Sequence, residues 1–212
     1  MGQTGEVTTT PFDVVGLPFP LEATHPLDWT AASASLAATA PARTDIFIDP
    51  AATADGEGVV LNAPALLGTP PAGDYQLTAR VTVDFAGTAD AGVLLLWADE
   101  TNWAKLCFEY SPAGDPTLVT VVCRGVADDS NSFTVDGDTA WMRISRVGRA
   151  YAFHGSVDGA HWELLRVFRL DAPHAEVRVG FEVQSPHGDG CAVRFDSIRF
   201  SRETLAALRD GS

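Results

Sequence analysis

The sequence contains little cysteine, and its few thiols are far apart. Three cysteines occur among 212 residues, Cys107, Cys123 and Cys191. An odd and dispersed set argues against a disulfide framework, and the absence of CxxC or HxxxH spacing argues against a zinc site. The start of the chain has no basic stretch followed by an apolar one, so it predicts no secretory signal. Dispersed thiols without such a signal fit a reducing compartment, and we therefore expect a cytoplasmic protein.

Positive charge is also scarce. The chain has 14 basic and 28 acidic residues, which gives a net charge of −14. Such a surface repels phosphate groups, so nucleic acids and anionic membranes are not expected partners. No apolar run approaches the roughly 18 residues that a membrane helix needs. The overall composition, 46% hydrophobic and 20% charged, is that of a globular chain with a real core.

Most of the chain alternates between apolar and polar residues, which is the pattern of β-strands. The alternation is clearest over Tyr75–Phe85, and the apolar run Ala91–Ala98 is typical of a strand that is covered on both faces. Other strands are expected at 44–49, 59–62, 103–110, 118–124, 140–146, 150–156, 162–170, 176–184 and 191–201. Residues 12–29 resemble an irregular edge strand, the structure of residues 30–43 is left open, and 203–209 resembles a short terminal helix.

No alternation of strands with helices occurs along the chain. The pattern therefore predicts an all-β fold, an antiparallel two-sheet jelly-roll sandwich of the concanavalin A-like kind with a short C-terminal helix. We expect residues 1–11 to be frayed. No linker or internal repeat divides the remainder, so residues 12–212 are expected to form a single domain.

Several expected strands carry long polar side chains on one face, because residues two apart point the same way. Lys105, Glu109, Arg143 and Gln184 would meet on one sheet surface if their strands were neighbours. Such a surface fits a concave site for a polar ligand. Trp103 would stack on a sugar ring beside these groups. The alternative is a solvated face with ordinary salt bridges.

Arg124 has two possible positions. A hairpin through Gly114 and Asp115 that pairs Cys107 with Cys123 would turn Arg124 toward the core. A slip of one residue would instead bring it beside Lys105 and Glu109. An arginine in the core is costly, so the slip or a bulge is favoured, and Arg124 joins the expected ligand-binding residues.

Sequence signatures of catalysis are mostly absent. The chain has no Glu-x-Asp-x-Glu string, GxSxG elbow, P-loop or GxGxxG. Glu109 and Glu182 could form a carboxylate pair across strands, and Lys105 or His154 could take part in acid–base chemistry. No cofactor is expected. The stretch Asp128-Asp129-Ser130-Asn131 resembles an acidic loop and could hold Ca²⁺, although such loops usually only make turns.

A series of short motifs runs in a fixed order from about residue 12 to residue 201. They are Thr44-Asp45, Trp103-Ala-Lys-Leu-Cys-Phe-Glu109, Val121-Val-Cys-Arg124, Asp128-Asp129, Arg143-Ile-Ser-Arg146, Ser156-x-Asp-Gly-x-x-Trp162, Val179-Gly-Phe181 and Gln184-Ser-Pro-x-Gly-x-Gly190. The series resembles the regulation-of-enolase family, which belongs to the concanavalin A-like lectin and glucanase superfamily. Cys123 stands where that family usually has threonine.

The resemblance implies a concanavalin A-like β-sandwich, and it does not fix an activity, because the superfamily holds sugar binders, glycosidases and lyases. Lys105, Glu109, Arg124, Arg143 and Gln184 match polar positions of the family pattern. Three hypotheses follow. The first is a binding protein for a small carbohydrate or polar metabolite. The second is a glycosidase, lyase or isomerase, and the third is a regulatory protein that binds a metabolic enzyme.

Overall fold

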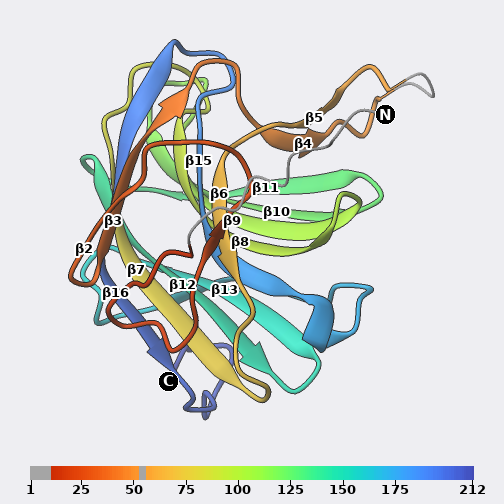
Figure 1. The fold of residues 1–212 in the computed structure, drawn as a ribbon, viewed down its shortest axis with the longest axis vertical. Coiled ribbons are helices and arrows are strands. Elements are labelled where there is room, and N and C mark those ends of the chain that lie inside the picture. The colour runs from red at the N-terminus through yellow and green to blue at the C-terminus, as the bar shows by residue number, and fades with distance from the viewer. Residues whose placement is uncertain (1–10, 53–55) are drawn as a thin grey trace, which may run out of the picture.

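Two large antiparallel sheets stack face to face in the computed structural model, which describes residues 11–52 and 56–212 (Figure 1). Sheet 1 has the strand order β1 (Glu22–Ala23), β6 (Ala65–Gly68), β15 (Arg178–Gln184), β8 (Ala91–Asp99), β9 (Asn102–Tyr110), β10 (Pro116–Arg124) and β11 (Ala127–Thr134). Sheet 2 has the order β14 (Glu163–Phe168), β13 (Ala150–Ser156), β12 (Thr139–Val147), β7 (Tyr75–Val83), β16 (Gly190–Ser201), β3 (Ser35–Pro41) and β2 (Thr30–Ala32). The predicted all-β sandwich is therefore confirmed.

In strand β7 the alternation of apolar and polar residues corresponds to an alternation of buried and partly exposed side chains. Its odd-numbered residues from Tyr75 to Val83 are buried between the sheets, and the even-numbered ones face outward. The core between the sheets is dense and aromatic, with Phe108, Phe153, Phe181 and Phe195 all fully buried. Burial of this much apolar surface is the main force that holds the two sheets together.

Sheet 1 is covered on its outer face as well, as the apolar run in β8 predicted. Ala91–Leu96 are buried without interruption, because a second apolar cluster lies on the side of sheet 1 that faces away from the core. A small two-stranded hairpin, β4 (Ile46–Ile48) with β5 (Val59–Leu61), adds Ile46 and Ile48 to this cluster. Figure 1 shows the hairpin apart from both large sheets, beside β10 and β11.

Three segments differ from what the sequence predicted. The acidic stretch at 128–131 is part of strand β11 and not a loop, and residues 30–43 form β2 and β3. The prediction of a helix at 203–209 is wrong. That segment ends in a turn, in which the Gly211 N–H bonds to the carbonyl oxygen of Ala207 at 3.0 Å. The only helical element in the described part of the chain is the 3-10 turn η1 (His174–Glu176).

No helix among the residues described is long and apolar enough to cross a membrane. Residues 1–10, most of the terminus expected to be frayed, lie outside the described residues.

Candidate functional site

A groove of about 620 Å³ lies between the outer face of sheet 1 and the β4–β5 hairpin. Strands β9, β10, β11 and β15 form its floor, and the hairpin forms a wall with Phe47 and Val60. Its polar lining includes Asp45, Lys105, Glu109, Asp129, Asn131 and Gln184. We call this space the sheet-1 groove.

Lys105 is the most constrained charged residue of the groove, and it is the only lysine in the sequence. Its side chain is 3% exposed. The Nζ atom donates to Asp45 Oδ1 and to Gln184 Oε1, each at 2.8 Å. Gln184 is fixed in turn, because its Nε2 donates to the carbonyl oxygen of Ala89 at 3.2 Å. The ammonium therefore has one N–H without an acceptor among the described residues, and Lys105 lines the groove.

The strand register explains why these side chains meet. Lys105 on β9 lies opposite Leu95 on β8, and Glu109 lies opposite Ala91, which in turn lies opposite Gln184 on β15. Positions two apart share a face, so these side chains all emerge on the outer side of sheet 1. The grouping of Lys105, Glu109 and Gln184 on one surface is as the alternation predicted.

Glu109 lies at the edge of the groove and is partly buried. Burial raises the pKa of Glu109 to about 7, although the Lys105 ammonium opposes this rise. The nearby carboxylates of Asp45 and Asp129 raise it further by repulsion. The carboxyl group is therefore divided between its neutral and charged forms near neutral pH.

Glu182 lies deeper than Glu109, on β15, with no exposed surface. Neither of its carboxyl oxygens has a hydrogen-bond partner within the described residues. Burial raises the pKa of Glu182 to about 8, and the charge of Lys105 only partly offsets this. A carboxyl group in such surroundings holds its proton at neutral pH.

The charge of Lys105 follows from the same balance. Burial alone lowers the pKa of an ammonium, but the adjacent Asp45 carboxylate, which accepts a hydrogen bond from Nζ, opposes burial most strongly, and the pKa of Lys105 is raised overall. Lys105 therefore stays protonated and acts as a hydrogen-bond donor, not as a nucleophile.

Two of the predicted site residues lie elsewhere. Arg143 on β12 and His154 on β13 lie opposite each other on the outer face of sheet 2, on the other side of the sandwich from Lys105. The His154 Nε2 donates to the Leu208 carbonyl oxygen at 2.8 Å, and burial lowers the pKa of His154 to about 4. The expectation that Arg143 converges with Lys105 is therefore wrong, because alternation along a strand does not say which sheet holds the strand.

Arg124 and Trp103 do not reach the sheet-1 groove either. Cys107 pairs with Val119 and not with Cys123. In this register Arg124 occupies one of the alternating positions of β10 that face the core. It avoids burial because it ends β10, where its Nη1 donates to the Arg169 carbonyl oxygen at 3.2 Å. Trp103 does lie on the face of Lys105, but it is fully buried and its ring has no face free for a sugar.

Sequence reasoning did not place Asp45, Asp129 or Asn131 at this site, and it considered the stretch with Asp129 and Asn131 only for Ca²⁺. Asp45 precedes β4, in a segment that only the three-dimensional structure brings over sheet 1. Asp129 and Asn131 alternate along β11, a strand whose sequence resembles a loop. One signal in the sequence could have ranked the site higher: a chain with 14 basic residues places its only lysine in the middle of a strand.

Among the described residues, no three His, Cys, Asp or Glu side chains lie close enough together to hold a metal ion. Asp128 and Asp129 follow each other along β11, so their carboxylates point to opposite faces. Asp128 pairs with Arg166 at 2.8 Å. The strand geometry thus separates the two carboxylates that the sequence offers for Ca²⁺.

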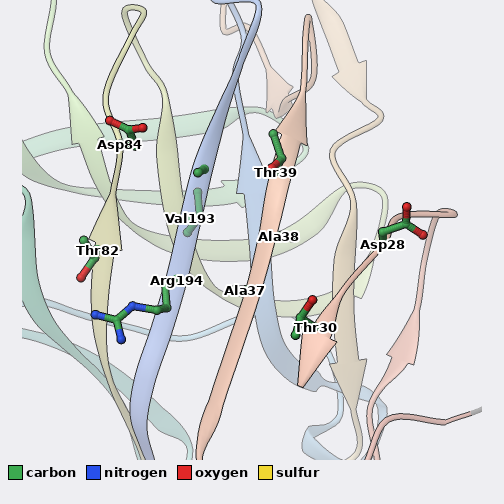
Figure 2. Close-up of a pocket in the computed structure, with 10 residues that line it drawn as sticks. Asp28, Thr30, Ala37, Ala38, Thr39, Thr82, Asp84, Val193 and Arg194 are labelled. Carbon is green, nitrogen blue, oxygen red and sulfur yellow. The ribbon is translucent and has the colours of Figure 1, made fainter. Parts of the chain in front are cut away.

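Another hollow lies on the outer face of sheet 2, over β3, β7 and β16 (Figure 2). Small side chains such as Ala37 and Thr39 form its floor, and its acidic residues Asp28 and Asp84 are exposed. Arg194 at this hollow pairs with Asp196 at 3.1 Å. This hollow has no buried polar group with free hydrogen-bonding capacity, so it is a weaker candidate than the sheet-1 groove.

Solved structures with a similar fold include a functionally unknown protein from Saccharomyces cerevisiae, with a TM-score of 0.76 and 18% identity, over 87% of this chain and 97% of that one. The GH43 BlXynB protein from Bacillus licheniformis matches with a TM-score of 0.65 and 14% identity, over 82% of this chain and 34% of that one. The carbohydrate binding module CBM66 from Bacillus subtilis matches with a TM-score of 0.52 and 15% identity, over 90% and 99%.

These likenesses show the fold alone. The chain spans about a third of the length of the GH43 protein. A search of curated sequences finds no match. Residues 23–203 match the family described as "Protein of unknown function (DUF1349)", and the chain belongs to this family.

Proposed function

We propose that this member of the DUF1349 family binds a small neutral carbohydrate or sugar-like metabolite in the sheet-1 groove. The observation that carries the proposal is the buried Lys105 ammonium, fixed at 2.8 Å by both Asp45 and Gln184 beneath an open groove. Holding a charge in this place is costly unless its remaining hydrogen bond is used. A ligand hydroxyl group that accepts from Nζ would use it.

The mixture of groups in the groove favours hydroxyl ligands. Lys105 and Asn131 supply donors, whereas Glu109, Asp45 and Asp129 supply acceptors. A sugar hydroxyl both donates and accepts, so it can join groups of the two kinds. Phe47 and Val60 supply an apolar wall against which the C–H face of a sugar ring can pack. The acidic residues disfavour a negatively charged ligand.

The similar fold of a carbohydrate binding module supports the proposal, and so do the GH43 structures, although at these identities only the fold is shared. We expect dissociation constants of roughly micromolar to millimolar, because a small ligand engages few buried atoms.

The test is a titration of the purified protein with a panel of neutral mono- and oligosaccharides. Calorimetry and protein NMR measure the binding. At least one sugar should bind, and at about pH 8, where the Glu109 carboxyl group is mostly charged, Glu109→Gln should weaken its binding about tenfold by replacing a charged acceptor with a neutral amide. Glu163→Gln is the matched control, because Glu163 is an exposed residue of β14 on the other sheet. Absence of binding across the panel, or equal affinity in Glu109→Gln, contradicts the proposal.

A catalytic role is the second candidate, and the raised pKa values of Glu109 and Glu182 favour it. A carboxyl group that titrates near neutral pH suits a general acid or base. Glu109 and Glu182 lie on β9 and β15 with β8 between them, and Glu109 is two residues beyond the position in register with Glu182, so their backbones are roughly 12 Å apart at the usual strand spacing and rise. Product formation from the sugars that bind, with a bell-shaped pH profile that Glu109→Gln abolishes, would show an enzyme. Binding without product leaves the first role.

A further inference from the structure

A second groove, of about 340 Å³, lies on the outer face of sheet 2 and so on the far side of the sandwich from the sheet-1 groove. Strands β7, β12 and β16 form its floor, and the indole rings of Trp141 and Trp162 lie at one side. Its polar groups include Gln76, Thr78, Arg143 and Arg199. We call it the sheet-2 groove.

The strand register places two arginines around one threonine. Thr78 on β7 lies opposite Arg143 on β12, and it also lies opposite Arg199 on β16. The three side chains emerge in one row across the sheet, with the threonine in the middle. Neighbouring strands are about 4.8 Å apart, so the two arginine backbones are roughly 10 Å apart. Two long side chains can reach a single small group over Thr78 from this separation.

The guanidinium group of Arg143 is buried, and no carboxylate of residues 11–52 or 56–212 pairs with it. Arg143 is 6% exposed, and its Nε has no hydrogen-bond partner within the described residues. Its other contacts are uncharged: Nη2 donates to the Gly211 carbonyl oxygen at 2.7 Å, and Nη1 donates to Gln76 Oε1 at 3.3 Å. The guanidinium also lies 4.2 Å from the ring centroid of Trp162.

The next row of the same sheet shows the usual arrangement. Arg80 lies two residues after Thr78 on β7, and it pairs with Asp196 at 2.8 Å. Its neighbour on β12 is Trp141, as Arg143 is the neighbour of Thr78. Neither Arg143 nor Arg199 forms an ion pair with any of the described residues. Burial lowers the pKa of Arg143 to about 10, which leaves the group positively charged at neutral pH. A buried charge of this kind is costly unless an opposite charge compensates for it.

We propose that the sheet-2 groove binds an oxyanion, the carboxylate or phosphate group of a small polar metabolite, between Arg143 and Arg199 and above Thr78. The planar guanidinium groups donate in pairs to two oxygens of such a group. The Thr78 hydroxyl donates to the same group from below. Trp141 and Trp162 supply apolar surface for the rest of the ligand. This proposal does not rest on the one made for the sheet-1 groove.

Two features act against an anion and limit what can bind. The whole protein carries a net charge of −14, and Glu203 lies at the rim of the sheet-2 groove. Repulsion from distant charges is screened at physiological salt within about 8 Å, so contacts with the two arginines dominate at the site. Removing the carboxylate in Glu203→Gln should therefore strengthen binding.

The experiment is a titration of the ¹⁵N-labelled protein with glucuronate, glucose 6-phosphate, inorganic phosphate and, as the neutral probe, glucose. We follow the indole N–H signals of Trp141 and Trp162. At least one anion should shift these signals and bind tenfold or more tightly than glucose does at this groove. The ranking of the three affinities identifies whether a sugar carboxylate, a sugar phosphate or free phosphate fits best. No shift with any of the three overturns the proposal.

Variants separate a binding site from a structural role. Arg199 is exposed, so Arg199→Gln should fold normally and bind the anion at least tenfold more weakly. Arg143→Lys keeps the charge but loses the paired donors, and it should weaken binding too. Arg149→Gln, in the exposed turn between β12 and β13, is the matched control and should bind as the native protein does. If Arg143 served only to hold Gly211, then Arg199→Gln would leave the affinity unchanged, and this result would overturn the proposal.

Discussion

The unpaired carboxyl group of Glu182 links the stability of sheet 1 to pH. The pKa of Glu182 is about 8 in the folded protein and close to its ordinary value of 4.5 in the unfolded chain. Between these values the folded state holds a proton that the unfolded chain releases, so the free energy of unfolding falls as pH rises from about 5 to 8. Below pH 4.5 both states hold the proton, and the contribution of Glu182 is fully present.

Glu182→Gln should remove this dependence, because an amide does not titrate. Relative to the native protein, the variant should gain stability as pH rises from about 5 to about 9. Urea denaturation of both proteins at the two pH values measures the change in their difference. Glu163→Gln should show no such change. A difference between Glu182→Gln and the native protein that stays the same at both pH values contradicts the assignment.

Lys105 should be chemically inert in the native protein. Reductive methylation needs an accessible and unprotonated amine, and the Lys105 side chain is 3% exposed and paired with Asp45. We expect no methyl groups on Lys105 at about pH 9 in the folded protein and complete modification in concentrated urea. Asp45→Asn should speed the reaction, because it removes the carboxylate that raises the pKa of Lys105. Peptide mass spectrometry measures each case. Equal rates in the folded and unfolded protein would contradict the described burial.

At the scale of residues, the sequence predicts which side chains share a face and not which strands share a sheet. Alternation placed Lys105 and Glu109 together correctly, and Gln184 joined them because β15, β8 and β9 are neighbours. Arg143 follows the same alternation on β12, in the other sheet. Asp45 could not be found from periodicity, because it precedes a short hairpin strand whose position depends on tertiary packing.

At the scale of elements, the β4–β5 hairpin has two faces with different roles. Ile46 is 4% exposed and packs in the apolar cluster on the outer side of sheet 1. Phe47, the next residue, lines the sheet-1 groove and is only partly buried. The hairpin is therefore held to the sheet mainly by its buried isoleucines, while Phe47 packs against the edge of the same cluster and also forms part of the groove wall.

Substitutions in β4 should separate stability from binding. Ile46→Ala should lower the free energy of unfolding by about 2–5 kcal/mol, as buried aliphatic truncations do. Phe47→Ala should cost less stability and should weaken binding of a sugar in the sheet-1 groove severalfold, because it removes the apolar wall. Thermal denaturation and calorimetric titration of the two variants measure these effects. The reverse order, with Phe47→Ala the more destabilising, would contradict this division.

Elements without a clear apolar face were the hardest to predict. Strand β11 is the edge of sheet 1, and Asp128–Ser132 are all exposed, so nothing in its sequence distinguishes it from a loop. The terminal segment shows the opposite error. Its leucines and alanines favour a helix, but the side chains of His154 and Arg143 hold the carbonyl oxygens of Leu208 and Gly211 in a turn. Long-range hydrogen bonds thus override a local preference.

At the scale of the whole molecule, the two grooves lie on opposite outer faces of one sandwich. They also differ in charge: carboxylates predominate in the sheet-1 groove, whereas the sheet-2 groove has two arginines that form no ion pair with the described residues. A neutral ligand and an anionic one could therefore be bound at the same time without contact between them.

Salt should distinguish the two sites. Raising sodium chloride from about 20 to 200 mM should weaken anion binding at the sheet-2 groove severalfold, because screening reduces the attraction between charges. The same change should leave the affinity of a neutral sugar in the sheet-1 groove nearly constant. Calorimetric titrations of each ligand at the two salt concentrations test this. Equal salt dependence for both ligands would contradict the assigned charges.

Lys105 is the only lysine in the sequence, and this has a practical consequence. A lysine-specific endoproteinase has a single target bond in the chain, between Lys105 and Leu106. That bond lies within β9, which is flanked by β8 and β10. Cleavage requires the middle of sheet 1 to open, so the rate at which the chain is cut in two reports the opening of these strands without any added label.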